Sequence, residues 1–144
     1  MKTLFDTSVL VAALVQGHPK HDRALPWLSK AKAKKFEYIV SSHTLAELYA
    51  VLSTLPVKPR ISANIAWRLI HENIERTAKI VSLSPSEYGA FIKFASDHGL
   101  SGGIIYDALI AKVAQKSKVE RILTLNIRHF KRVWYGDENM LIEP

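Results

Sequence analysis

Residues 2–15 have the sequence KTLFDTSVLVAALV, a short apolar strand that passes directly into an apolar helix. We expect the strand over Lys2–Phe5 and the helix over about residues 7–15, with Asp6 at the junction. The same order recurs along the chain. Further strands are predicted near residues 38–40, 79–83, 121–125 and 140–142, and further helices near 19–34, 42–55, 61–75, 85–98 and 104–116. Strands that alternate with helices imply a parallel sheet covered by helices on both faces.

Helix boundaries are marked by residues that favour caps. Ser84 followed by Pro85 and, three positions on, Glu87 forms a capping-box pattern, and the helix it starts should stop at Gly99. Ser42 is expected to cap the helix that ends near residue 55.

The composition fits one globular domain over residues 1–144, with 48% hydrophobic and 23% charged residues. Cysteine is absent, which excludes disulfides and thiolate metal sites. The longest run without a charged residue, Thr7–Pro19, is too short to span a bilayer, and its sequence suits a first core helix better than a signal peptide. We therefore expect a cytoplasmic protein with no membrane segment.

Three carboxylates, those of Asp6, Glu47 and Asp107, are embedded in apolar patterns. A buried carboxylate must be paired, hydrogen-bonded or metal-bound, and several converging carboxylates repel one another unless a cation joins them. In a parallel sheet, ligands bind at the carboxyl ends of the strands. Asp6 and Asn126 each follow a predicted strand there, and Glu47 lies in the helix after another. The sequence therefore predicts a hard divalent metal held by oxygen ligands.

The rest of the chain is basic, with 20 Lys and Arg against 13 Asp and Glu and a formal charge of +7. A cluster of acids within a basic surface suits a nuclease, because the basic surface attracts a polyanion while the acids hold a metal.

Each acid also has a purely structural interpretation. Asp6 could cap the first helix, Asp107 could complement a helix dipole, and Asn126 is a common turn residue. Glu47 has no such role in the middle of its helix. His43, near the start of that helix, is interpreted as structural. The three acids and Asn126 are all predicted at one edge of the sheet, and this favours a shared site.

Four segments in order, FDTSVL, AEL, SGGIIYDALIA and TLNIRHF, give the chain a specific resemblance over nearly its full length. It resembles the PIN-domain ribonucleases, and among them the VapC-type toxins of bacterial toxin–antitoxin pairs. The resemblance implies a three-layer α/β/α domain with a central parallel sheet of four or five strands. It also implies Mg²⁺ or Mn²⁺ as cofactor, RNA as substrate, a homodimer, and inhibition by a cognate antitoxin.

The family's acidic positions carry over one by one. Asp6, Glu47 and Asp107 match the first three acids, and Asn126 matches the fourth, which is Asp in many members and Asn in others. His129 stands where a further Asp often occurs. With Asn126 the pocket has one negative charge fewer, so metal should bind more weakly and a second ion is doubtful.

The implied chemistry is metal-assisted phosphodiester hydrolysis. Asp6 and Asp107 would be the main ligands, directly or through water, and Glu47 would orient or deprotonate the attacking water. Ser8 and Thr124 match hydroxyl positions of the family and could orient carboxylates or water.

Two surfaces are candidates for partners. The first follows Asn126 and is expected to hold RNA, with Phe130 and Trp134 interleaved among Arg128, His129, Lys131 and Arg132. The second is a possible apolar strip for a dimer or antitoxin contact, for which core packing is the alternative: Trp67, Leu69, Ile70 and Ile74. In the same helix Ile65 is expected to face the core.

Two other functions compete with the toxin ribonuclease. One is a non-catalytic RNA-binding module of PIN type, suggested by Asn126 and by the acid missing at His129. The other is a basic α/β interaction protein whose acids are only structural.

Overall fold

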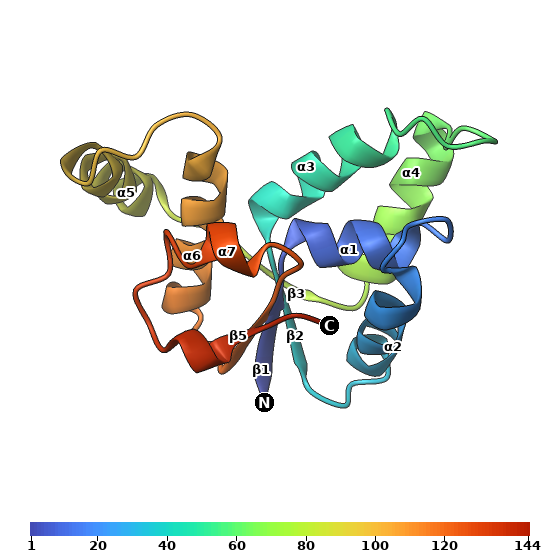
Figure 1. The fold of residues 1–144 in the computed structure, drawn as a ribbon, viewed down its shortest axis with the longest axis horizontal. Helices are drawn as coiled ribbons and strands as arrows, with labels where there is room; N and C mark the ends of the chain where they lie inside the picture. The colour runs from blue at the N-terminus through green and yellow to red at the C-terminus, as the bar shows by residue number, and fades with distance from the viewer.

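The computed structural model describes all 144 residues and is built on a five-stranded parallel sheet with the strand order β3-β2-β1-β4-β5. Its strands are β1 (Lys2–Phe5), β2 (Glu37–Ser41), β3 (Lys79–Val81), β4 (Arg121–Leu123) and β5 (Leu141–Ile142). Because β1 is central and each neighbour runs the same way, the carboxyl ends of all five strands meet at one edge (Figure 1).

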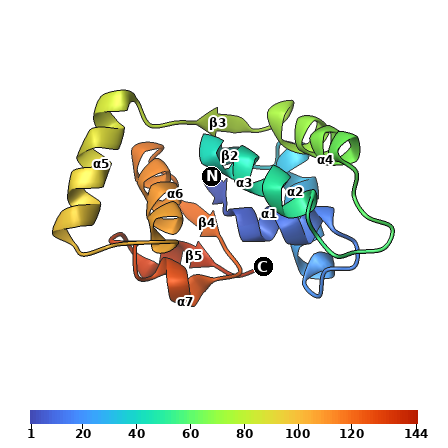
Figure 2. The ribbon, with the colours of Figure 1, turned by 90° about the horizontal axis from the view of Figure 1, so that it is seen from above.

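Helices cover both faces of the sheet (Figures 1 and 2). One layer contains α1 (Thr7–Leu14), α2 (His21–Lys32), α3 (Ser42–Leu52) and α4 (Ala63–Ile70), which continues as a π-helical turn over His71–Glu75. The other layer contains α5 (Pro85–Asp97), α6 (Ile104–Lys116) and α7 (Ile127–Phe130), and a 3-10 turn over Glu138–Met140 precedes β5. The predicted three-layer α/β/α fold with a parallel sheet is confirmed.

Alternation along the strands divides the apolar residues into two cores. Leu4 and Ile39 point into the core under α5 and α6, whereas their neighbours Phe5 and Val40 point into the core under α1 to α4. The strands β1 and β2 are therefore buried on both faces, as expected of a parallel sheet between two helical layers. No helix of the structure is long and apolar enough to cross a membrane.

Two details of the helices differ from the prediction. Ser42 is the first residue of α3 rather than its cap; Ser41 takes the cap position, with no side-chain capping bond, and the helix already ends at Leu52. Ile65 is 49% exposed, not part of the core. The core-facing residues of α4 are Ala66 and Ile70, and Ile65 lies about 100° around the helix from Ala66.

The predicted apolar strip divides between core and surface. Ile70 and Ile74 are buried, and Leu69 packs against the same core. Trp67 is 52% exposed and stacks on His71, with ring centroids 5.0 Å apart. The large exposed apolar side chains of α4 are therefore Trp67 and Ile65, which do not share a face of the helix.

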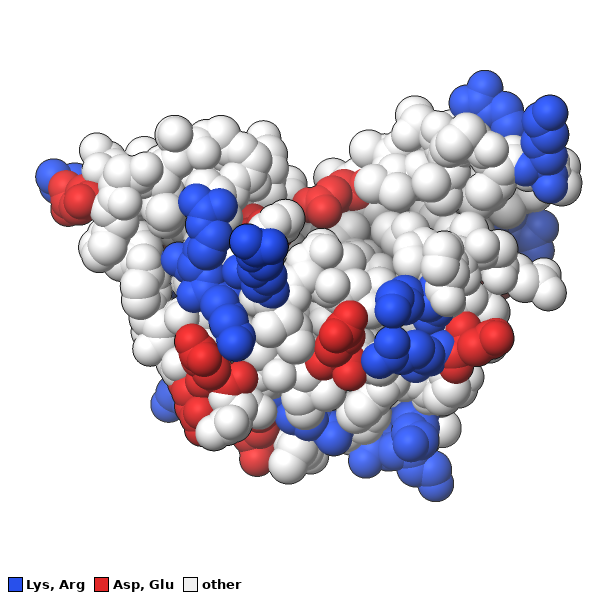
Figure 3. Space-filling model, in the orientation of Figure 1, with Lys and Arg blue, Asp and Glu red and all other residues white.

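The space-filling view shows a hollow between the lobe of α5 and α6 and the lobe of α3 and α4 (Figure 3). Acidic side chains lie in this hollow, and Lys and Arg side chains gather beside it over the region of α7. The hollow lies at the carboxyl edge of the sheet, where α1, α3 and α7 begin and where α6 starts opposite α3 (Figure 1).

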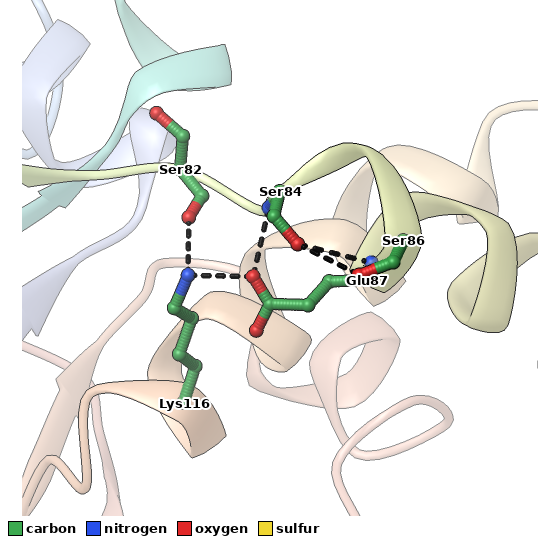
Figure 4. Close-up of polar contacts among 5 residues, drawn as sticks. All are labelled: Ser82, Ser84, Ser86, Glu87 and Lys116. Atoms are coloured by element: carbon green, nitrogen blue, oxygen red, sulfur yellow. Dashed lines mark hydrogen bonds and ion pairs between the residues drawn. The ribbon is translucent and has the colours of Figure 1, made fainter.

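The start of α5 is held by the predicted capping box (Figure 4). The Glu87 N–H donates to Ser84 Oγ at 3.2 Å, and the Ser84 N–H donates to Glu87 Oε1 at 2.7 Å. Lys116, in the last turn of α6, donates to the same Glu87 oxygen at 2.7 Å and to the Ser82 carbonyl at 2.8 Å. Chiefly because of the Lys116 contact, the pKa of Glu87 falls to about 2.

Candidate active site

Asp6 is fixed in the sheet edge by its backbone and by two hydroxyl groups. It follows β1 directly, and its N–H extends the β1–β4 ladder by donating to the Leu123 carbonyl at 2.9 Å. Its side chain is 4% exposed, and Oδ2 accepts from Ser8 Oγ at 2.7 Å and Thr124 Oγ1 at 2.8 Å. Asp6 takes the cap position of α1, but its side chain makes no capping bond. The shortest hydrogen bonds of this carboxylate therefore come from hydroxyl groups.

The two hydroxyls are themselves held by backbone donors that follow β4. The Leu125 N–H donates to Ser8 Oγ and the Asn126 N–H donates to Thr124 Oγ1, each at 3.0 Å. Each hydroxyl thus accepts from the backbone and directs its own hydrogen to Asp6. Asn126 enters this network through its backbone, while the residue as a whole is exposed at the start of α7.

Burial raises the pKa of Asp6 above its ordinary value, although the Ser8 and Thr124 hydroxyls oppose the rise by stabilising the charged form. No Lys or Arg forms an ion pair with this carboxylate. Keeping Asp6 ionised in so buried a position is unfavourable without a cation.

Asp107 lies in the first turn of α6 and is half-buried. Burial, and then the charges of Asp6 and Glu47, raise its pKa to about 6, while His129 opposes the rise. A carboxylate that only complemented the helix dipole would have a lowered pKa. Asp107 thus lies near enough to Asp6, which follows β1, and to Glu47 of α3 for each of their charges to act on it.

Glu47 occupies the second turn of α3 at the mouth of the site, with 36% of its side chain exposed. The His43 imidazole, one turn earlier, donates from Nε2 to Glu47 Oε2 at 3.1 Å. The same imidazole stacks on the ring of Tyr106, with centroids 4.8 Å apart and the planes within 4° of parallel. Tyr106 immediately precedes Asp107, so this contact joins the starts of α3 and α6.

The start of α3 is also anchored internally. Thr7 Oγ1 donates to Thr44 Oγ1 at 3.0 Å, and both side chains are buried. Because Thr7 follows Asp6 and Thr44 lies one turn before Glu47, this bond fixes the backbone that carries the two acids.

The donors suit a hydrated hard cation better than a closed metal cage. No three acidic or histidine side chains lie close enough together to hold an ion by themselves. All candidate ligands are oxygen atoms, and Mg²⁺ commonly keeps several waters while it binds through one or two carboxylates. The mutual repulsion at Asp107 and the unpaired charge of Asp6 are what such an ion would relieve.

The surface beside the acids is basic, as Figure 3 shows over α7. The residues predicted to hold RNA are all exposed, and Lys131 is also paired with Glu138 at 3.6 Å: Arg128, His129, Lys131 and Arg132. Phe130 and Trp134 are buried in the core, so their spacing reflects packing and they are closed to bases.

Sequence reasoning missed the contact between His43 and Tyr106. The i, i+4 spacing of His43 and Glu47 on one helix was a signal that the two side chains interact. For Tyr106, the only signal in the sequence was its position next to Asp107. An exposed tyrosine cannot be told from a core aromatic on an amphipathic helix until the fold shows which face of α6 is buried.

Residues 3–134 match the PIN domain family. The chain belongs to the PIN domain family. Ribonuclease VapC27 of Mycobacterium tuberculosis is 32% identical over 115 residues, which cover 80% of this chain and 78% of that protein. Ribonuclease VapC40 of the same species is 30% identical over 123 residues, which cover 85% of each. This PIN domain is therefore of the VapC ribonuclease type.

A solved structure agrees with this assignment. The PIN domain superposes on the crystal structure of VapBC2 from Rickettsia felis bound to a DNA fragment from their promoter, with a TM-score of 0.65 and 25% identity. The match covers 99% of this chain and 98% of the other.

Proposed function

We propose that this PIN domain is a divalent-metal-dependent endoribonuclease that acts as the toxin of a toxin–antitoxin pair. The observation that carries the proposal is the environment of Asp107: burial, and then the charges of Asp6 and Glu47, raise its pKa to about 6, and no Lys or Arg pairs with it. Such a site suits a cation together with an anionic substrate. The likeness to ribonucleases VapC27 and VapC40 supports RNA as that substrate.

Mg²⁺ or Mn²⁺, when bound, would offset this repulsion and stabilise the negative charge that builds up on the phosphate. Asp6 and Asp107 would hold the ion, directly or through water. Ser8 and Thr124 keep Asp6 Oδ2 in one orientation, which leaves the carboxylate little to reorganise on binding.

Glu47 would act on the water that attacks the phosphate. Its side chain is 36% exposed, and its hydrogen bond from His43 fixes one carboxylate oxygen. Glu47 Oε1 is then free to orient the attacking water or accept its proton. Asn126 would add a neutral oxygen from the rim of the site.

The exposed cations beside α7 would hold the RNA backbone. Arg128, Lys131 and Arg132 are exposed in and after α7, and His129 among them is near enough to Asp107 to affect its pKa. Contacts of this kind release counterions, so the affinity for RNA should fall as salt rises.

The test is cleavage of small structured RNAs by the purified protein with Mg²⁺ or Mn²⁺. We expect cleavage that stops with EDTA and with Asp6→Asn, a variant that keeps the shape of the side chain and removes its charge. Cleavage that survives both controls would mean a contaminant or another site, and would overturn the proposal.

A second candidate is a non-catalytic RNA-binding module. Two observations favour it: Asn126 is neutral at the fourth acidic position, and no three acid or histidine groups form a closed metal site. RNA binding without metal-dependent cleavage in the same assay would support this alternative.

The remaining proposals concern assembly and context. We propose one PIN domain over residues 1–144, a cytoplasmic location, a cognate antitoxin and a homodimer. The likeness to VapBC2 supports an antitoxin, whose gene should lie beside this one and whose co-expression should relieve toxicity. Light scattering should give twice the chain mass of 16.2 kDa. A mass of one chain would exclude the homodimer.

A further inference from the structure

The rings of Tyr106 and His43 form a flat aromatic pair at the mouth of the site. Their centroids are 4.8 Å apart and their planes differ by 4°, so one face of Tyr106 is covered by the imidazole. Tyr106 is nevertheless 53% exposed. A tyrosine that only filled the core would be buried, so a large part of this ring is available to a ligand.

The pair is attached to the residues that carry the proposed chemistry. Tyr106 precedes Asp107 in the first turn of α6, and His43 lies one turn before Glu47 in α3. The His43 hydrogen bond to Glu47 at 3.1 Å limits rotation of the imidazole, so this ring is held in place against Tyr106. A molecule stacked on Tyr106 would therefore lie beside the acids.

Other aromatic side chains near the basic surface do not offer such a platform. Phe130 and Trp134 are buried. Tyr135 is exposed, but it packs edge-on against Phe94, with ring centroids 5.7 Å apart, and lines a pocket shared with α5 and α6. Sequence-specific recognition of RNA commonly uses unpaired bases that stack on exposed aromatic rings.

We propose that Tyr106, supported by His43, is a stacking platform for an unpaired nucleobase of the RNA next to the scissile phosphate. The proposal rests on the ribonuclease function above and adds a substrate feature to it: at least one splayed, single-stranded base at the cleavage site. Tyr106 binds the base, and His43 is a positioning residue for both Tyr106 and Glu47.

The test uses a single-stranded RNA dodecamer with one 2-aminopurine at its centre, a fluorescent base whose emission falls when it stacks. The probe is titrated with the protein in EDTA, so that binding is read without cleavage. We expect the emission at saturation to be quenched by the wild type and by Tyr106→Phe. Tyr106→Leu should abolish the quench and weaken binding by about 5- to 100-fold, the usual loss for one base stacked on an aromatic ring.

Two further variants separate the roles of His43. His43→Phe keeps a ring under Tyr106 but cannot donate to Glu47, so the quench should persist while the cleavage rate falls. His43→Ala removes both functions, and both readouts should fall. If His43→Phe lost the quench while Tyr106→Leu kept it, the stacking role would be overturned.

The matched control is Tyr88→Leu, which removes another exposed tyrosine, from the start of α5. It should leave quench and affinity unchanged, and thermal melting checks that every variant is folded. Saturable binding without quenching, or equal quenching by Tyr106→Leu, would overturn the platform while RNA cleavage still supported the ribonuclease. A wild type that neither binds nor cleaves RNA would overturn both.

Discussion

Two acidic side chains lie near opposite ends of α6 and have opposite pKa shifts: Glu87 of α5 and Asp107 of α6 itself. Glu87 meets Lys116 at the last turn and has its pKa lowered to about 2. Asp107, in the first turn, has its pKa raised to about 6 by burial and then by the charges of Asp6 and Glu47. The first acid has its cation within the chain and serves to join α5 to α6. The second lacks one, which is the mark of a site that takes a cation from solution.

The largest effect is expected at Asp6. Asp6→Asn should lower the RNA cleavage rate by about 100-fold or more, because the charge that would hold the cation is lost. Without metal, the same variant should melt at a higher temperature than the wild type at neutral pH, because it removes a buried carboxylate whose pKa burial raises. A cleavage-deficient variant that is also less stable in EDTA would indicate a structural role instead. Differential scanning fluorimetry in EDTA measures the melting temperatures of the two proteins.

The hydroxyls that orient Asp6 should matter next. Thr124→Val removes the donor to Asp6 Oδ2 and the acceptor for the Asn126 N–H. Cleavage should fall by about 10- to 100-fold, as is usual for groups that orient a metal ligand. Thr3→Val is the matched control, since Thr3 is equally buried but follows the start of β1, where its hydroxyl contacts Arg121. Equal loss of activity in both variants would contradict the account.

Asp107 predicts a pH dependence of stability in metal-free protein. Its pKa is raised on folding, so its stabilising contribution is full below its ordinary pKa near 4 and is lost as the pH rises through about 6. From about pH 4 to 7, the wild type should lose about 1 to 2 kcal/mol relative to Asp107→Asn, a range that allows for solvent screening. Urea unfolding across this pH range measures it, and a constant difference between the two proteins would argue against the repulsion.

The smallest effect on activity is expected at the capping box that Ser84 forms with Glu87, the acid paired with Lys116. Ser84→Ala removes the cap of α5 and should cost about 1 kcal/mol of unfolding free energy. Because the capping box touches none of the three acids, cleavage per folded molecule should not change. A loss of activity beyond the loss of folded protein would show that the two regions are coupled.

Much of this architecture could be predicted from local signals. The strand at Lys2–Phe5, the helix at Ile104–Lys116 and the capping box at Ser84 depend on apolar periodicity and on residues that favour helix starts. Patterns placed Ile65 in the core wrongly, because a short helix leaves the rotation of its apolar face to tertiary contacts.

The site was only partly predictable. The three acids stood out because carboxylates are costly in apolar segments. The hydrogen bond from Thr124 to Asp6 connects residues 118 positions apart, and only the family resemblance pointed to it and to the Ser8 hydroxyl. The stacking of His43 on Tyr106 depends on how α3 and α6 face each other, which no local pattern encodes.

Calorimetric titration of Mn²⁺ into the protein at neutral pH distinguishes a shared cation site from separate structural acids. The account predicts saturable binding to the wild type and to Glu87→Gln, and binding at least about 10-fold weaker to Asp6→Asn and to Asp107→Asn. Equal Mn²⁺ affinity in all four proteins, or no binding to the wild type, would contradict it.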